Sequence, residues 1–128
     1  MRVLVTGATG YIGRHTLPIL VRSGHTVHAT SRTLPDLAAR SRVPAAWHSV
    51  DLLTPGAPEW IIEQVRPEAV LHFAWNATPG VYWTAADNAD WEEATVSLFS
   101  AFADAGGRRF VGAGTCAEYD WSHAERCN

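Results

Sequence analysis

The chain has 128 residues, of which 47% are hydrophobic and 18% charged, and its formal net charge is −3 at pH 7. These values are typical of one globular domain, which we expect to span residues 1–128. The charge is not gathered into a basic patch and no apolar stretch reaches about 18 residues, so nucleic-acid binding and a membrane span are both excluded. Two late cysteines, and an N-terminus that passes directly into a strand, favour a cytoplasmic location.

The hydrophobic pattern predicts alternating strands and helices along the chain. We expect strands at Val3–Thr6, Thr26–Thr30, Ala46–Val50, Ala69–Ala74 and Arg109–Gly112. We expect helices at Tyr11–Ser23, Thr33–Arg40, Glu59–Val65 and Asn88–Ala105. This alternation requires right-handed crossovers, so it predicts an α/β fold of the Rossmann type, a doubly wound parallel sheet with strand order 3-2-1-4-5.

Spacing along the helices predicts which side chains are buried. In the first helix the expected inner positions are Ile12, His15, Thr16, Ile19 and Leu20. In the last helix they are Trp91, Ala94, Thr95, Leu98, Ala101, Phe102 and Ala105. We expect Trp47 and Trp60 to be filler residues of the core and surface rather than the wall of a substrate cleft. His72 is the lone histidine of an apolar strand, and we expect it to be a core residue rather than a catalyst.

A glycine-rich turn lies between the first strand and the first helix. Gly7 suits a tight turn, Gly10 leaves room for a pyrophosphate, and Gly13 allows the helix to lie close to the strand. The N–H groups around Tyr11 and Ile12 face a helix N-terminus, where anions bind. The pattern therefore predicts dinucleotide binding, and a purely structural turn is the alternative. An ATPase-type loop needs a lysine, which the chain lacks.

Two further features of this region bear on the cofactor. Thr9 either adds a hydroxyl to the phosphate site or only shapes the turn. At the end of the second strand, Ser31 and Arg32 stand where an NAD enzyme usually has a carboxylate. Because an arginine can pair with a 2′-phosphate, we expect NADP to be preferred over NAD. The alternative is that Arg32 is a solvated surface residue.

Four motifs in register make a family resemblance specific. They are Thr6-Gly-Ala-Thr-Gly-Tyr-Ile-Gly13, Asp51-Leu52, His72-Phe-Ala-Trp75 and Gly114-Thr-Cys-Ala-Glu-Tyr119. Together they resemble the extended short-chain dehydrogenase/reductases, the NAD-dependent epimerase/dehydratase family. The resemblance implies an oxidoreductase, epimerase or dehydratase that acts by hydride transfer, on a nucleotide sugar or a similar small molecule.

The resemblance also implies roles for single residues. Asp51 and Leu52 match an acidic-apolar pair beside the adenine, although Asp51 could instead cap a turn. Ala74 and Trp75 match backbone that passes along the cofactor, although the family usually has a small residue where Trp75 stands. Thr115 matches a supporting hydroxyl beside the reacting oxygen. No spacing of His, Cys and Asp suggests a metal site.

One part of the family pattern is missing from the sequence. The resemblance implies a Tyr followed four residues later by a Lys, whereas the tyrosines here are Tyr11, Tyr82 and Tyr119 and there is no lysine. We interpret the chain as a truncated, incomplete cofactor-binding domain that is inactive alone. A non-catalytic NADP-binding regulatory module, or a degenerate remnant, is the alternative.

Such a chain is expected to be marginally stable and to associate, for example as a homodimer, because its last strand would be an exposed sheet edge. Four residues are candidates for the near wall of a substrate cleft: Trp83, Glu118, Tyr119 and Trp121.

Overall fold

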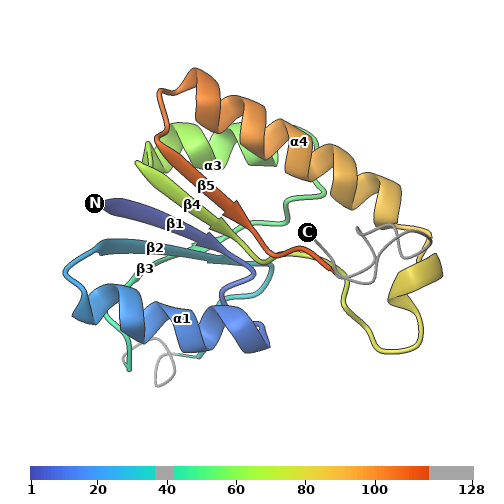
Figure 1. The fold of residues 1–128 in the computed structure, drawn as a ribbon, viewed down its shortest axis with the longest axis horizontal. Coiled ribbons are helices and arrows are strands. Elements are labelled where there is room, and N and C mark those ends of the chain that lie inside the picture. The colour runs from blue at the N-terminus through green and yellow to red at the C-terminus, as the bar shows by residue number, and fades with distance from the viewer. Residues whose placement is uncertain (37–41, 116–128) are drawn as a thin grey trace, which may run out of the picture.

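In the computed structural model, which describes residues 1–36 and 42–115, one five-stranded parallel sheet carries helices on both faces (Figure 1). The strands are β1 (Arg2–Thr6), β2 (Thr26–Ser31), β3 (Ala46–Ser49), β4 (Ala69–His72) and β5 (Arg109–Gly112). Their order in the sheet is β3-β2-β1-β4-β5, which confirms the predicted fold class and strand order. The chain therefore reverses its winding direction between β1 and β4, where α/β sheets bind ligands.

The helices are α1 (Tyr11–Arg22), α3 (Ala57–Val65) and α4 (Asn88–Asp104), and a short 3₁₀ turn, η1, spans Tyr82–Thr84. Most predicted boundaries are within two residues of these. The predicted helix from Thr33 to Arg40 is wrong over residues 33–36, which form a bend at Thr33 followed by three residues without regular secondary structure. Its remaining positions, 37–40, lie outside the described residues.

The helix α1 covers one face of the sheet and the pair α3 and α4 covers the other (Figure 1). On the α1 side, Leu17 packs with Val3, Val5 and Val27. The prediction for α1 is correct in part: Leu20 packs against this core and Thr16 is half-buried, whereas Ile12 and Ile19 are 52% and 55% exposed and the buried positions are Gly13 and Leu17. Leu20 and Val21 also pack against this core, and the close approach of Gly13 to the glycine turn leaves no space for a side chain at position 13.

The larger core lies between the sheet and the pair α3 and α4. Every buried residue of α4 was predicted: Trp91, Ala94, Leu98 and Phe102. They pack with Ile61, Ile62 and Val65 of α3. Trp47 packs at the edge of the α1-side core, and Trp60 lies on the surface at 46% exposure because the opposite side of α3 faces the sheet; both positions agree with the expected role as core and surface filler.

Strand β4 ends at His72, two residues earlier than predicted, and the two residues that follow it are hydrogen-bonded to Thr6. The Thr6 hydroxyl lies 2.7 Å from Nδ1 of His72, and it accepts weak bonds from the backbone N–H groups of Phe73 and Ala74 at 3.2 and 3.3 Å. The Phe73 N–H also bonds to the Thr6 carbonyl at 3.3 Å, so Thr6 holds the ends of β1 and β4 together through both its hydroxyl and its backbone. The floor of the crevice at the switch point is built in this way.

Within the described residues, β5 pairs on one side only, with β4. Phe110 points toward α4, where its ring packs edge-on against Phe99 with 5.3 Å between centroids. Phe99 is nevertheless 52% exposed, and Val111, on the opposite face, is 44% exposed. Each face of the sheet at this edge therefore carries an exposed apolar side chain.

Candidate functional site

The glycine turn between β1 and α1 leaves no room for a Cβ at Gly7 or at Gly13. Gly7 has φ +63°, and a Cβ there would lie 2.7 Å from the backbone of Phe73 and Ala74. A Cβ on Gly13 would overlap the carbonyl oxygen of Gly7, whose oxygen also accepts the N–H of Gly10 at 3.0 Å. The backbone of this turn is thus packed against both β4 and its own helix, as the sequence predicted for Gly7 and Gly13.

The N-terminus of α1 opens beside this turn. Tyr11, Ile12 and Gly13 are the first residues of the helix, so their N–H groups have no acceptor four residues back. The first turn contains no acidic residue that would neutralise the positive end of the helix dipole. The Tyr11 and Ile12 side chains point to solvent, at 74% and 52% exposure, so only their backbone can serve an anion.

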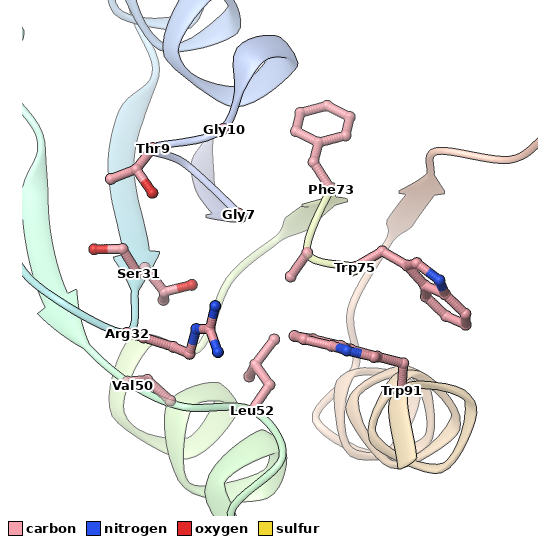
Figure 2. Close-up of a pocket in the computed structure, with 12 residues that line it drawn as sticks. Gly7, Thr9, Gly10, Ser31, Arg32, Val50, Leu52, Phe73, Trp75 and Trp91 are labelled. Atoms are coloured by element: carbon pink, nitrogen blue, oxygen red, sulfur yellow. The ribbon is translucent and has the colours of Figure 1, made fainter. Parts of the chain in front are cut away.

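A hollow lies in front of the turn, across the carboxyl ends of β1, β2 and β4 (Figure 2). Eight predicted site residues line it: Gly7, Thr9, Gly10, Ser31, Arg32, Leu52, Ala74 and Trp75. Four more line it that were not predicted as site residues: Thr30, Val50, Phe73 and Trp91. Segments from five separate parts of the sequence therefore converge on one concave surface.

The end of β2 presents an arginine to this hollow. Figure 2 shows the Arg32 side chain extending from the end of β2 toward Leu52 and Trp91. The Arg32 carbonyl accepts the Ser49 hydroxyl at 3.0 Å, and the Ser31 hydroxyl donates to the Thr33 carbonyl at 2.7 Å. The backbone around Arg32 is thus anchored on both sides, while its side chain is exposed.

Asp51 and Leu52 play different parts. Leu52 is 4% exposed and lines the hollow, whereas Asp51 is exposed and lines a separate surface depression. The Oδ1 atom of Asp51 accepts the backbone N–H of Leu53 at 3.1 Å, which is an Asx turn. This geometry favours the turn-capping alternative for Asp51, which fixes the loop that carries Leu52 inward.

A second, polar hollow adjoins the first and shares Arg32, Trp75 and Trp91 with it. Here the two carboxylate oxygens of Asp87 accept Nδ2 of Asn76 at 3.0 and 3.1 Å, and Oδ2 also accepts Nε1 of Trp91 at 3.1 Å. The Asn76 bonds are the main cause that lowers the pKa of Asp87, and Trp91 and the Arg32 charge add to it. Asp87 is therefore ionised at neutral pH.

His72 is buried behind the switch point and is not exposed to either hollow. Its Nδ1 faces the Thr6 hydroxyl at 2.7 Å and its Nε2 faces Oγ1 of Thr95 at 2.9 Å. Burial lowers the pKa of His72 to about 4, so the ring is neutral at pH 7. The prediction that His72 is a satisfied core residue is confirmed.

Thr115 follows β5 as the sequence predicted, at the carboxyl edge of the sheet, and it is exposed. Trp83 is 59% exposed in η1. Glu118, Tyr119 and Trp121 lie outside the described residues. Over residues 1–36 and 42–115, no three His, Cys, Asp or Glu side chains gather into a metal-binding group. None of the helices in this part of the chain has the length and apolar character needed to cross a bilayer.

Sequence reasoning found the backbone of the site and missed part of its wall. Trp91 was assigned to the core from helical spacing, and it is buried, but its indole also borders both hollows. Asn76 and Asp87 were not singled out, because they stand 11 positions apart in loops with no hydrophobic period. The only local signal was Asp87 in the N-cap position of α4, where an aspartate is common.

The sequence matches one protein-family model and several characterised proteins. The family model described as the NAD dependent epimerase/dehydratase family matches residues 3–127. A UDP-glucose 4-epimerase of Dictyostelium discoideum is 35% identical over 80 residues, which are 57% of this chain and 23% of that protein. A chloroplastic divinyl chlorophyllide a 8-vinyl-reductase of Zea mays is 36% identical over 80 residues, 56% of this chain and 19% of that protein.

Solved structures agree with the sequence matches. The crystal structure of the Thermus thermophilus UDP-glucose 4-epimerase in complex with NAD has a TM-score of 0.72 and 26% sequence identity. The match covers 100% of this chain and 42% of that one. The chain thus spans less than half the length of these relatives.

Proposed function

The chain belongs to the NAD-dependent epimerase/dehydratase family, and from this we propose that it binds a nicotinamide dinucleotide in the hollow in front of the glycine turn. We further propose that it is the cofactor-binding portion of an enzyme that acts on nucleotide sugars. The observation that carries the proposal is the helix N-terminus of α1, which opens without a counter-charge beside Gly7 and Gly10.

The phosphates are proposed to lie at the turn. The N–H groups of Tyr11, Ile12 and Gly13 would donate to them, because these amides lack helical acceptors and the helix dipole attracts negative charge. Thr9 lines the same hollow and can add its hydroxyl. Gly10 contributes by the absence of a side chain, which lets the phosphates reach the amides.

The adenosine is proposed to lie farther along the hollow, over the ends of β2 and β3. Leu52 and Val50 offer apolar surface for the base, and Asp51 supports this contact through the turn that it caps. Ala74 and Trp75 follow β4 and would flank the cofactor on the other side.

The finer choice between the two cofactors rests on Ser31 and Arg32. The Thermus thermophilus relative was solved with NAD, which supports a nicotinamide dinucleotide as such. Arg32 extends into the hollow and can pair with a 2′-phosphate, so we propose that NADP is the preferred form. A charge-assisted pair of this kind contributes about 1.5–3 kcal/mol.

The proposed chemistry is a hydride transfer, which the nicotinamide supplies when it is bound. Relatives named as an epimerase and as a reductase support this shared step rather than one reaction. Thr115 would orient a substrate oxygen through its hydroxyl. The 128 residues contain no lysine to act with a tyrosine, so we expect no turnover from this chain alone.

Titration calorimetry of the 128-residue chain with NAD and with NADP tests the proposal, and a Kd below about 1 mM for either supports it. The informative variant is Gly10→Ala, whose methyl would sit 3.2 Å from the Gly7 oxygen at the phosphate approach, so that oxygen must shift by a few tenths of an ångström, and circular dichroism checks that the variant is folded. We expect at least a tenfold loss of affinity. Gly112→Ala, where a Cβ meets nothing within 4 Å, is the matched control. Absence of heat with both nucleotides on natively folded protein refutes the proposal.

A further inference from the structure

The polar hollow beside the proposed adenosine site holds an unassigned carboxylate. Asp87 and Arg32 both line this hollow, together with Trp75, Trp91 and Asn76. Among the described residues that line the two hollows, Arg32 is the one cation and Asp87 the one carboxylate. The Arg32 side chain therefore stands between a proposed ligand site and a fixed negative charge.

Asp87 is held in place by two side chains that donate hydrogen bonds to its carboxylate. Nδ2 of Asn76 bridges both carboxylate oxygens, and Nε1 of Trp91 adds a third bond. The orientation of Asn76 is itself fixed, because its Oδ1 accepts the backbone N–H of Thr78 at 3.2 Å and the Thr78 hydroxyl at 2.8 Å. The carboxylate thus cannot swing away from the hollow without breaking a network that reaches into α4.

Charge in this network acts on Arg32 and on whatever binds beside it. The Arg32 charge is among the causes that lower the pKa of Asp87, which follow the Asn76 hydrogen bonds, so the two groups attract each other. A ligand phosphate that pairs with Arg32 must compete with this attraction and must also approach a second negative charge. A ribose hydroxyl meets neither penalty.

We propose that Asp87 is a specificity residue that weakens the binding of NADP and leaves the binding of NAD nearly unchanged. The inference rests on the proposed dinucleotide site, in which the 2′ position of the adenosine lies near Arg32. Asn76 and Trp91 are positioning residues in this arrangement, because they act by holding the carboxylate. The balance between Arg32 and Asp87 then sets the cofactor ratio.

The test measures Kd values for NAD and NADP with the 128-residue chain and its Asp87→Asn variant. Asparagine keeps an oxygen that can accept the Trp91 N–H and removes the charge. We expect NADP to bind about fivefold more tightly to the variant, the ratio that one partly exposed charge pair produces, with NAD within twofold of its original Kd. Asp90→Asn, which removes the same charge three residues along on the first turn of α4, is the control.

Two further variants keep the test decisive. Asp87→Ser removes the charge in a residue that suits a helix N-cap, and it serves if the asparagine variant does not fold. In an Arg32→Gln background the gain from Asp87→Asn should shrink, because no cation is left to be released. An NADP/NAD ratio that stays within twofold of the original in both Asp87 variants overturns the inference and leaves the proposed function standing. Absence of binding of either nucleotide to the unchanged chain overturns both.

Discussion

Lowering the pH from 7 to 4 is expected to destabilise the chain through His72. The ring is 5% exposed and sits between two threonine hydroxyls. Thr95 donates its proton to the carbonyl of Trp91 at 2.8 Å, so it accepts from Nε2 of His72. Thr6 accepts from two backbone N–H groups, so it donates to Nδ1. This arrangement fits only the neutral ring with its proton on Nε2, and a second proton on Nδ1 has no acceptor.

The size of the effect follows from the pKa of His72. The pKa is about 4 in the folded chain against an ordinary value of 6.5, because burial disfavours the charged ring. The folded state therefore binds fewer protons than the unfolded state between these two values. The contribution of the neutral His72 ring to the free energy of unfolding is fully present above pH 6.5 and is lost as the pH falls toward 4. The difference is equivalent to about 3 kcal/mol of unfolding free energy.

Urea unfolding followed by circular dichroism, at half-unit steps from pH 7.5 to 4, measures this loss. Carboxylates also titrate in the lower half of the range, so the informative quantity is the difference between the unchanged chain and His72→Asn. Asparagine can accept near the Nδ1 position and does not titrate, so the variant should be less stable at pH 7 and should lose less on acidification. His15→Gln, at an exposed position, is the matched control. Equal losses in the unchanged chain and in His72→Asn, or an NMR titration of His72 with a midpoint near 6.5, would refute the reasoning.

Three other predictions concern packing, a second histidine site and the sheet edge. Gly13→Ala should cost about 1–3 kcal/mol in urea unfolding, because the new methyl meets fixed backbone of the glycine turn; a loss below about 0.5 kcal/mol would contradict the packing argument. His28 and His48 contact each other at 3.0 Å, and burial lowers both pKa values, so both rings should be neutral at pH 7 and should titrate below 6.5 with loss of stability. Since the charge of His48 also lowers the pKa of His28, His48→Gln should raise the His28 midpoint in an NMR titration, and an unchanged midpoint would count against the coupling. Val111→Lys should reduce concentration-dependent association measured by sedimentation, because a charge on an exposed edge strand discourages pairing.

The part of the fold that depends on short-range pattern was predictable from sequence. Five apolar runs separated by helical segments leave few topologies, and right-handed crossovers select among them. The inner face of α4 was also predictable, since 17 residues contain enough turns to define its phase. The phase of α1 was partly misassigned, because the exposed Ile12 and Ile19 were counted as inner positions while Leu17, Leu20 and Val21 form the apolar stripe that packs on the sheet.

The candidate site also has a part that was predictable from local sequence and a part that was not. The backbone of the site, from Gly7 to Gly13, was found because each glycine has a local steric reason to be there. The Asp87, Asn76 and Trp91 network was missed because polar side-chain contacts leave no trace in hydrophobic spacing, although Trp91 follows Asp87 by only four residues and Asn76 precedes it by 11. The role of Asp51 stayed open between two alternatives because an Asx turn and a ligand contact need the same residue type.

Because of the Thr6 hydroxyl, the crevice is ordered before a ligand binds. By tying the ends of β1 and β4 together, the hydroxyl gives the crevice its width while the polypeptide folds, before any partner molecule arrives. The entropy lost in ordering this junction is therefore a cost of folding and not of association. A valine at position 6 would be nearly equal in size but would remove the hydroxyl shared by the Ala74 N–H, the Phe73 N–H and Nδ1 of His72, of which Phe73 would keep its bond to the carbonyl of residue 6. The mouth of the crevice would then widen, and a ligand would have to close it on binding.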